Sequence, residues 1–152
     1  MLIATHSLVG AAIGVNVSYP PLAFLLGFIS HFLLDAIPHC DGPDDVLNRK
    51  ESSSFRQYLV VTIDGVVAII AIIYFGLHTE NSGFYWGALG GIFPDIIDNV
   101  PILKEYTRKI KGFEKFHLFH SWIQSKKTGI LAGITIQYAI LYAVVLYLLG
   151  IF

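Results

Sequence analysis

The sequence predicts an all-α protein, a polytopic transmembrane bundle of about five helices that forms a single domain over residues 1–152. Two observations lead to this prediction: 55% of the residues are hydrophobic, with a mean hydropathy of +0.64, and only 14% are charged. An ordinary soluble domain is about a quarter charged, so a bilayer is the expected solvent. The apolar residues form five runs bounded by Pro, Gly or charged residues: 2–17, 22–38, 58–77, 83–97 and 128–150.

Each apolar run is long enough for a full or nearly full crossing of the hydrocarbon core. The first two are separated by SYPP, residues 18–21, where proline removes a backbone donor and disfavours helix in the residue before it. A tight helical hairpin is therefore expected. The second and fourth runs have 17 and 15 residues and are roughly 22–26 Å long as helices. They either tilt little, thin the bilayer locally or are partly re-entrant.

The basic residues indicate how the helices are oriented. All ten Lys and Arg residues fall in two connecting segments, 39–57 and 98–127, and five crossings place both segments on the side of the N-terminus. The positive-inside rule makes this side cytoplasmic, so we expect a multi-pass protein of the cell inner (plasma) membrane. The formal net charge of −1 excludes a global attraction to nucleic acid. Cys40 is the only cysteine, so no intrachain disulfide can form.

Small residues recur at four-residue spacing in three places: GAAIG (10–14), GALGG (87–91) and GILAG (129–133). In a membrane, such spacing lets helix backbones approach closely. The three motifs predict a compact bundle.

The histidines and several carboxylates gather on the predicted cytoplasmic side, whereas His78 lies in a short turn on the other side and is predicted to be solvated. Three pairs are three or four residues apart, which places both side chains on one helix face: His31 with Asp35, Asp95 with Asp98, and His117 with His120. Ionisable groups in such apolar segments cost several kcal/mol unless something compensates them.

Imidazole and carboxylate are the ligands of Zn²⁺ and also of Mn²⁺ and Fe²⁺, and a bound divalent ion would offset that cost. We therefore predict a site for one or two divalent ions, with zinc first and manganese or iron as alternatives. The predicted metal ligands are His6, His31, Asp35, His39, Asp95, Asp98, His117 and His120. Asp64 and Asp41 are the predicted catalytic residues, because a carboxylate that does not bind the ion can act as general base.

Each of these features also has an interpretation without metal. The pair on the second helix could be a buried His–Asp hydrogen bond, and the HLFH segment could belong to an amphipathic helix at the interface. Asp64 could orient a histidine. His39 and Asp41 follow Pro38 in a loop, where solvated polar residues are common.

Four motifs together resemble those of small membrane-bound metal-dependent hydrolases, a family similar to zinc-dependent phospholipase C. They are TH near the N-terminus, SHFLLD, GALGGIFPDIID and HLFHS, and they are spread over residues 5–121. The motif order is permuted, because the HxxxD helix (31–35) precedes the PDIID and HLFHS elements here. The resemblance implies a hydrolase that acts at the membrane, with ligands at His6, His31, Asp35, Asp95, Asp98, His117 and His120.

The sequence thus predicts a membrane-embedded metal-dependent hydrolase whose partners are membrane lipid and a phosphoester or lipid substrate. The basic residues of segment 104–127 would attract such an anionic substrate. One alternative is a metal-ion or proton transporter, but a transport pathway needs access from both faces, whereas the ligands lie on one side. Another is a scaffold protein in which the ion only stabilises the fold.

Overall fold

A computed structural model describes residues 1–40, 54–125 and 128–150. Within these residues the protein is all-α, with seven helices and no strand, which confirms the all-α part of the predicted fold class. The helices are α1 (Ile3–Gly14), α2 (Pro20–Asp35), α4 (Ser54–Gly76), α5 (Gly83–Asn99), α6 (Pro101–Thr107), α7 (Phe113–Ile123) and α8 (Ile130–Leu148). Five of them correspond to the predicted apolar runs.

Segment 98–127, predicted above as a loop, instead contains α6 and α7. Pro101 begins α6, where its fixed φ and missing N–H suit the first helical turn. Gly112 has a φ of 94°, a left-handed conformation that favours glycine, and it separates α6 from α7. Both helices mix polar with apolar residues, so a search for long apolar runs does not find them.

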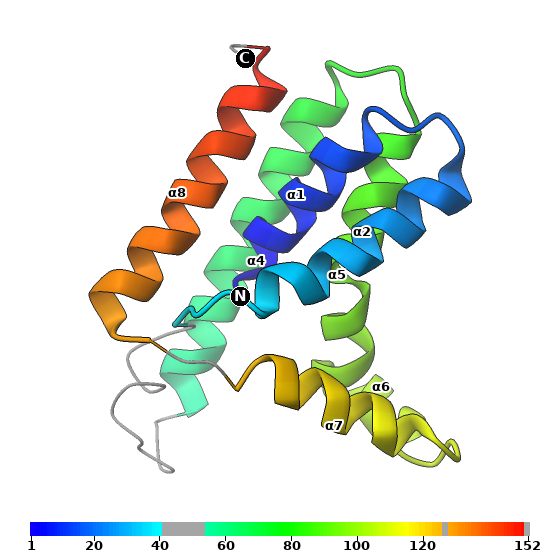
Figure 1. Cartoon of the computed structure of the whole chain (residues 1–152), viewed down its shortest axis with the longest axis vertical. Coiled ribbons are helices and arrows are strands. Elements are labelled where there is room, and N and C mark those ends of the chain that lie inside the picture. The colour runs from blue at the N-terminus through cyan, green and yellow to red at the C-terminus, as the bar shows by residue number, and fades with distance from the viewer. Residues whose placement is uncertain (41–53, 126–127, 151–152) are drawn as a thin grey trace.

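Helix α1 lies at the centre of the bundle, although it has only 12 residues. It contacts α2, α4, α5 and α8, and Figure 1 shows it between α8 and α2. Its buried residues include the consecutive Thr5, His6, Ser7 and Leu8. A helix buried on nearly every side belongs to the interior of the protein rather than to its surface.

Glycines allow α1 and α2 to pack directly on α5. A Cβ atom added at Gly10 or Gly27 would run into the backbone carbonyl of Gly87, and one at Gly14 would meet the carbonyl of Gly83. The backbones therefore touch, as the first two small-residue motifs predict. This contact brings the polar ends of α1, α2 and α5 together.

Helix α8 is joined to the rest of the bundle by a buried glutamine. Gln137 accepts the backbone N–H of Leu2 at 2.9 Å and donates to the carbonyl of Cys40 at 2.6 Å. Gly133 lets Cys40 approach α8, whereas Gly129 has open space around it. Of the two glycines at the ends of the third motif, only Gly133 is thus in close contact with another segment. That segment is the chain just beyond α2, at Cys40, and not a neighbouring helix.

Two helices are long and apolar enough to cross a membrane, over Leu59–Gly76 in α4 and Ile130–Leu148 in α8. Most of their side chains are exposed on the outside of the bundle. An exposed apolar surface of this extent marks contact with lipid or with a partner. Helices α1 and α2 are apolar but shorter, with 12 and 16 residues. The length of α1 along its axis is only roughly 18 Å.

Replacement of Gly87 tests the close helix packing. Gly87→Ala should lower the free energy of unfolding by about 1–3 kcal/mol or more, because its Cβ would overlap the backbone of α1. The measurement is chemical unfolding in mixed micelles. Gly65→Ala is the control: no atom lies within 4 Å of a Cβ there, so the change should stay below about 1 kcal/mol. Equal effects of the two substitutions would contradict the proposed contact.

Candidate metal centre

The side chain of Asp35, at the end of α2, is fully buried and holds several elements together. Its Oδ1 accepts a hydrogen bond from the amine of Met1 at 2.7 Å and lies 3.1 Å from Nε2 of His6 on α1. Its Oδ2 lies 3.1 Å from Nε2 of His31, one turn earlier on α2. The same oxygen accepts from the amide of Gln124, just beyond α7, at 2.8 Å. One buried carboxylate therefore connects α1, α2 and α7.

The protonation of His31 follows from its neighbours. Its Nδ1 lies 2.7 Å from the backbone carbonyl of Gly91 on α5, and because a carbonyl can only accept, Nδ1 carries the proton. In the neutral ring the lone pair is then on Nε2, which faces Asp35. Histidines that bind metal ions are commonly oriented by such a bond from the other ring nitrogen.

His120 on α7 is oriented in the same way by Asp98 on α5. Its Nδ1 lies 2.9 Å from Oδ2 of Asp98, and Nδ1 of His117 lies 2.7 Å from Oδ1. Each oxygen of Asp98 thus accepts from a histidine, and Nε2 of a neutral His120 retains its lone pair. The arrangement makes Asp98 a support for a metal ligand.

Three acceptor atoms consequently converge on one point: Nε2 of His31, Nε2 of His120 and Oδ2 of Asp35. The two nitrogens are 3.0 Å apart, and the oxygen lies 3.1 Å from the first and 3.4 Å from the second. Acceptors this close repel one another unless a proton or a cation lies between them. Ligands of a tetrahedral Zn²⁺ are roughly 3.3 Å apart, given bonds of about 2.0–2.1 Å. This triangle of acceptors therefore matches three corners of a metal tetrahedron.

A second possible metal group consists of His6, His31 and Asp95. His6 is buried, its ring stacks on His31 at 4.0 Å, and its Nδ1 has no hydrogen-bond partner among the described residues. Oδ1 of Asp95 lies 3.9 Å from Nε2 of His31 and 3.6 Å from Nε2 of His120. Because His31 has one free lone pair, it can bind only one ion at a time, and the two groups share it.

Hydrogen bonds and ion pairs already engage most of these atoms. The amine of Met1 contacts Nε2 of His39 at 2.9 Å in addition to Asp35, and the amide nitrogen of Gln124 contacts Nε2 of His120 at 2.9 Å. A bound ion would have to replace some of these contacts. The donor set itself suits Zn²⁺, Mn²⁺ and Fe²⁺ alike.

Five of the eight predicted metal ligands belong to the two groups found among the described residues: His6, His31, Asp35, Asp95 and His120. Asp98 and His117 lie beside the groups as a hydrogen-bonded pair. His39 is buried, with Nε2 3.9 Å from Oδ1 of Asp35. The structure thus brings the predicted ligands to one region. Five of them form the two possible metal groups, and the other three lie beside these groups.

Of the two predicted catalytic carboxylates, only Asp64 lies among the described residues, and it belongs to neither group. Oδ2 of Asp64 on α4 accepts the backbone N–H of Ala4 at 3.2 Å, near the N-terminus of α1, where the helix dipole favours negative charge. Asp41 lies outside the described residues, so the role of either residue as general base stays a prediction. His78 is exposed, as predicted, and its Nδ1 donates to the carbonyl of Tyr74 at 2.7 Å.

Sequence reasoning missed three contributors to this site: the amine of Met1, Gln124 and the carbonyl of Gly91. Gln124 lies four residues after His120 and so faces the same way as that histidine, a signal that was present in the sequence. The Gly91 carbonyl is a backbone group, and no side-chain pattern identifies it. This carbonyl can orient His31 only because α5 lies opposite His31 in the folded bundle.

Comparison of the chain with models of known protein families, with curated proteins and with solved structures found no match. The likeness to membrane-bound metal-dependent hydrolases therefore rests on the short motifs alone.

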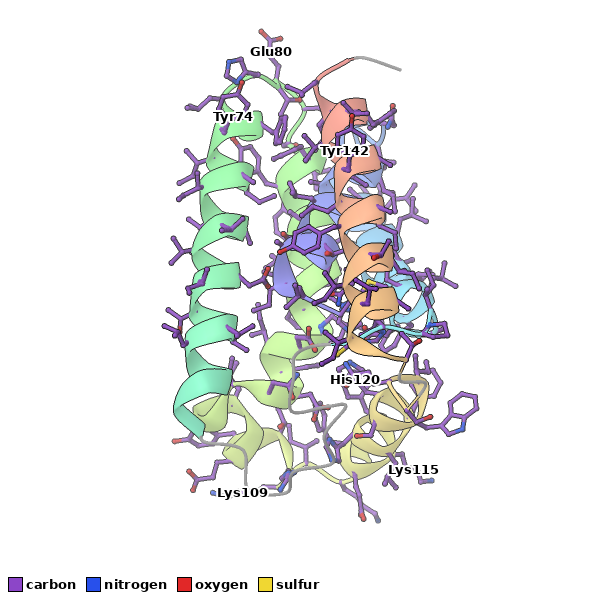
Figure 2. The ribbon with its side chains drawn as sticks, turned by 90° about the vertical axis from the view of Figure 1, so that its left-hand side faces the viewer. Tyr74, Glu80, Lys109, Lys115, His120 and Tyr142 are labelled. Atoms are coloured by element: carbon purple, nitrogen blue, oxygen red, sulfur yellow. The ribbon has the colours of Figure 1, made fainter. Side chains whose placement is uncertain are left out.

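The supporting role of Asp98 leads to a prediction about metal affinity. Asp98→Asn should weaken Zn²⁺ binding by about 10–100-fold, because an amide cannot accept from both His117 and His120. Equilibrium dialysis of the detergent-purified protein measures the change. Glu80→Gln, at the opposite end of the bundle (Figure 2), should leave the affinity unchanged. An unaltered affinity in Asp98→Asn would show that this carboxylate does not orient a ligand.

The protonation of His120 should make metal binding sensitive to acid. Burial alone would lower the pKa of His120, but its hydrogen bonds with Asp35 and Asp98 and the charge of Asp95 raise that pKa above its ordinary value. An ion must displace this proton, so the apparent affinity should fall by about tenfold per pH unit below the raised pKa and level off above it. Titrations with Zn²⁺ between pH 5 and pH 9, on the order of one unit apart, measure this. A flat profile would contradict ligation by His120.

Proposed function

We propose that the protein is a membrane-embedded, metal-dependent hydrolase that acts on a phosphoester or lipid at one face of the membrane. The observation that carries this proposal is the convergence of three acceptor atoms, from His31, Asp35 and His120, at distances suited to a tetrahedral ion. The residues that orient both histidines, Gly91 and Asp98, support a metal centre over an incidental cluster.

The exposed apolar side chains on the surface of the bundle support the proposed location in a membrane. Helices α4 and α8 expose most of their apolar side chains, and lipid is the solvent that suits them. With α1, α2 and α5 in the same bundle, we propose a multi-pass arrangement in the plasma membrane. Figure 2 shows Lys109 and Lys115 at the same end as His120, and Glu80 at the other end. The positive-inside rule then makes the metal end cytoplasmic.

When bound, a divalent ion supplies Lewis acidity and lowers the pKa of a coordinated water. His31, His120 and Asp35 would hold the ion, and Gly91 and Asp98 keep the two imidazoles in the required orientation. Lysines at this end, including Lys109 and Lys115, would attract an anionic substrate. Asp64 and Asp41 remain the proposed general bases.

The position of the cluster favours hydrolysis over transport. The two groups that could hold an ion lie at one end of the bundle, and His78 and Glu80, at the other end, are exposed. A transport pathway would need polar groups through the apolar middle. The transporter thus has less support than the hydrolase.

Metal-dependent hydrolysis tests the proposal directly. Zn²⁺- or Mn²⁺-loaded protein in lipid vesicles should cleave bis(p-nitrophenyl) phosphate or a vesicle phospholipid, and His31→Ala should lower the rate on the order of 100-fold or more. The matched control is His78→Ala, which removes an exposed histidine far from the site and should keep the rate.

Other outcomes of this experiment would identify the alternatives. Stoichiometric metal without cleavage of either substrate class, together with unfolding on metal removal, would favour a scaffold. Metal uptake into the vesicles would favour a transporter. Absence of metal from the purified protein, even after reconstitution, would contradict all three metal-based functions.

A further inference from the structure

Gln124 is the residue immediately after α7 and lies at the edge of the acceptor triangle. Its amide nitrogen is 2.8 Å from Oδ2 of Asp35 and 2.9 Å from Nε2 of His120. His31, Asp35 and His120 are buried, whereas Gln124 is partly exposed. It therefore lies between the buried acceptors and the outside of the protein.

The hydrogen bonds of Gln124 use the same lone pairs that an ion would use. In the neutral ring of His120, Nε2 has a single in-plane lone pair, which cannot both accept from Gln124 and bind a cation. An ion on the triangle would also repel the two amide hydrogens. A half-turn of the amide about its last side-chain bond exchanges nitrogen for oxygen within almost the same volume, and it turns the side chain from a donor into a possible ligand.

The amide also lies within hydrogen-bond distance of two of the three corners of the triangle. After the half-turn, Oε1 would stand close to the present position of the nitrogen, which is 2.8 and 2.9 Å from two corners. The measured edges of the triangle are 3.0, 3.1 and 3.4 Å. The rival fourth ligand, Oδ1 of Asp95, lies 3.6 Å from Nε2 of His120, farther than the Gln124 amide, and 3.9 Å from Nε2 of His31.

We propose that Gln124 is the exchangeable fourth ligand of the metal centre, binding through Oε1 when an ion occupies the triangle. This inference rests on the metal centre of the proposed function. The amide is neutral and, of the four groups, the one that is partly exposed. It is therefore the ligand that a water molecule or the phosphoryl oxygen of a substrate would replace, which gives the open position that a catalytic ion needs. Gln124 thus regulates access to the ion.

Cobalt substitution with azide as a probe tests this assignment without relying on activity. Co²⁺-loaded wild-type protein should show the visible absorption of a four-coordinate ion. In Gln124→Leu the fourth position is open to small ligands, so azide should alter the Co²⁺ spectrum at a concentration at least about tenfold lower than in wild type, where Gln124 leaves that position open only part of the time. In Gln124→Glu an anionic ligand occupies the position, so azide should lose its effect and Co²⁺ should bind more tightly.

Gln137→Leu is the matched control, because it makes the same substitution at another buried glutamine, one that contacts Leu2 and Cys40 instead of the triangle. Its Co²⁺ spectrum and azide response should equal those of wild type. Identical azide responses in wild type, Gln124→Leu and Gln124→Glu would overturn the role of Gln124 and leave the metal centre intact. Failure of the wild type to bind Co²⁺ would instead overturn the centre itself, and this assignment with it.

Discussion

The burial of the Asp35 carboxylate is the constraint on which the polar half of this structure depends. An unpaired charge at a fully buried position costs several kcal/mol or more, so its partners must be brought to it. They come from the N-terminal segment and from the end of α7, as the amine of Met1, His6 and Gln124. Three segments far apart in the sequence are thereby fixed relative to one another, and the acceptor triangle is a consequence of that requirement.

Glycine packing supplies the second requirement, close approach of the backbones. A Cβ on Gly91 would overlap the backbone carbonyl of His6, so α1 and α5 are in direct contact at the level of the site. The carbonyl of the same Gly91 receives Nδ1–H of His31 from α2. A larger residue at this position would separate α1 from α5 and move the group that sets the tautomer of His31. Gly91 therefore couples two features of the structure: the close packing of α1 on α5, and the position of the proton on the His31 ring.

Much of this arrangement could be predicted from the sequence, since apolar runs locate α1, α2, α4, α5 and α8, and a spacing of three or four residues reports which side chains share a helix face. The gathering of histidines and carboxylates followed from counting crossings. Spacing within one helix does not report which atom of a neighbouring helix lies opposite, so the sequence could not separate His120, which faces the triangle, from Asp98, which orients it. Helix α7 was predicted only as an alternative, an amphipathic helix that contains HLFH, because its apolar residues form no long run.

The number of ions depends on free lone pairs rather than on the number of histidines and carboxylates. Nδ1 of His31 and Nδ1 of His120 are committed to Gly91 and Asp98, and both oxygens of Asp98 are committed to histidines. Each imidazole then has one electron pair to give, and His31 belongs to both candidate groups. Two ions at this site would have to share a bridging carboxylate, either Asp35 or Asp95. Only one of the two ions could bind His31. The described contacts therefore leave room for one ion on the triangle, with Gln124 as its proposed fourth ligand.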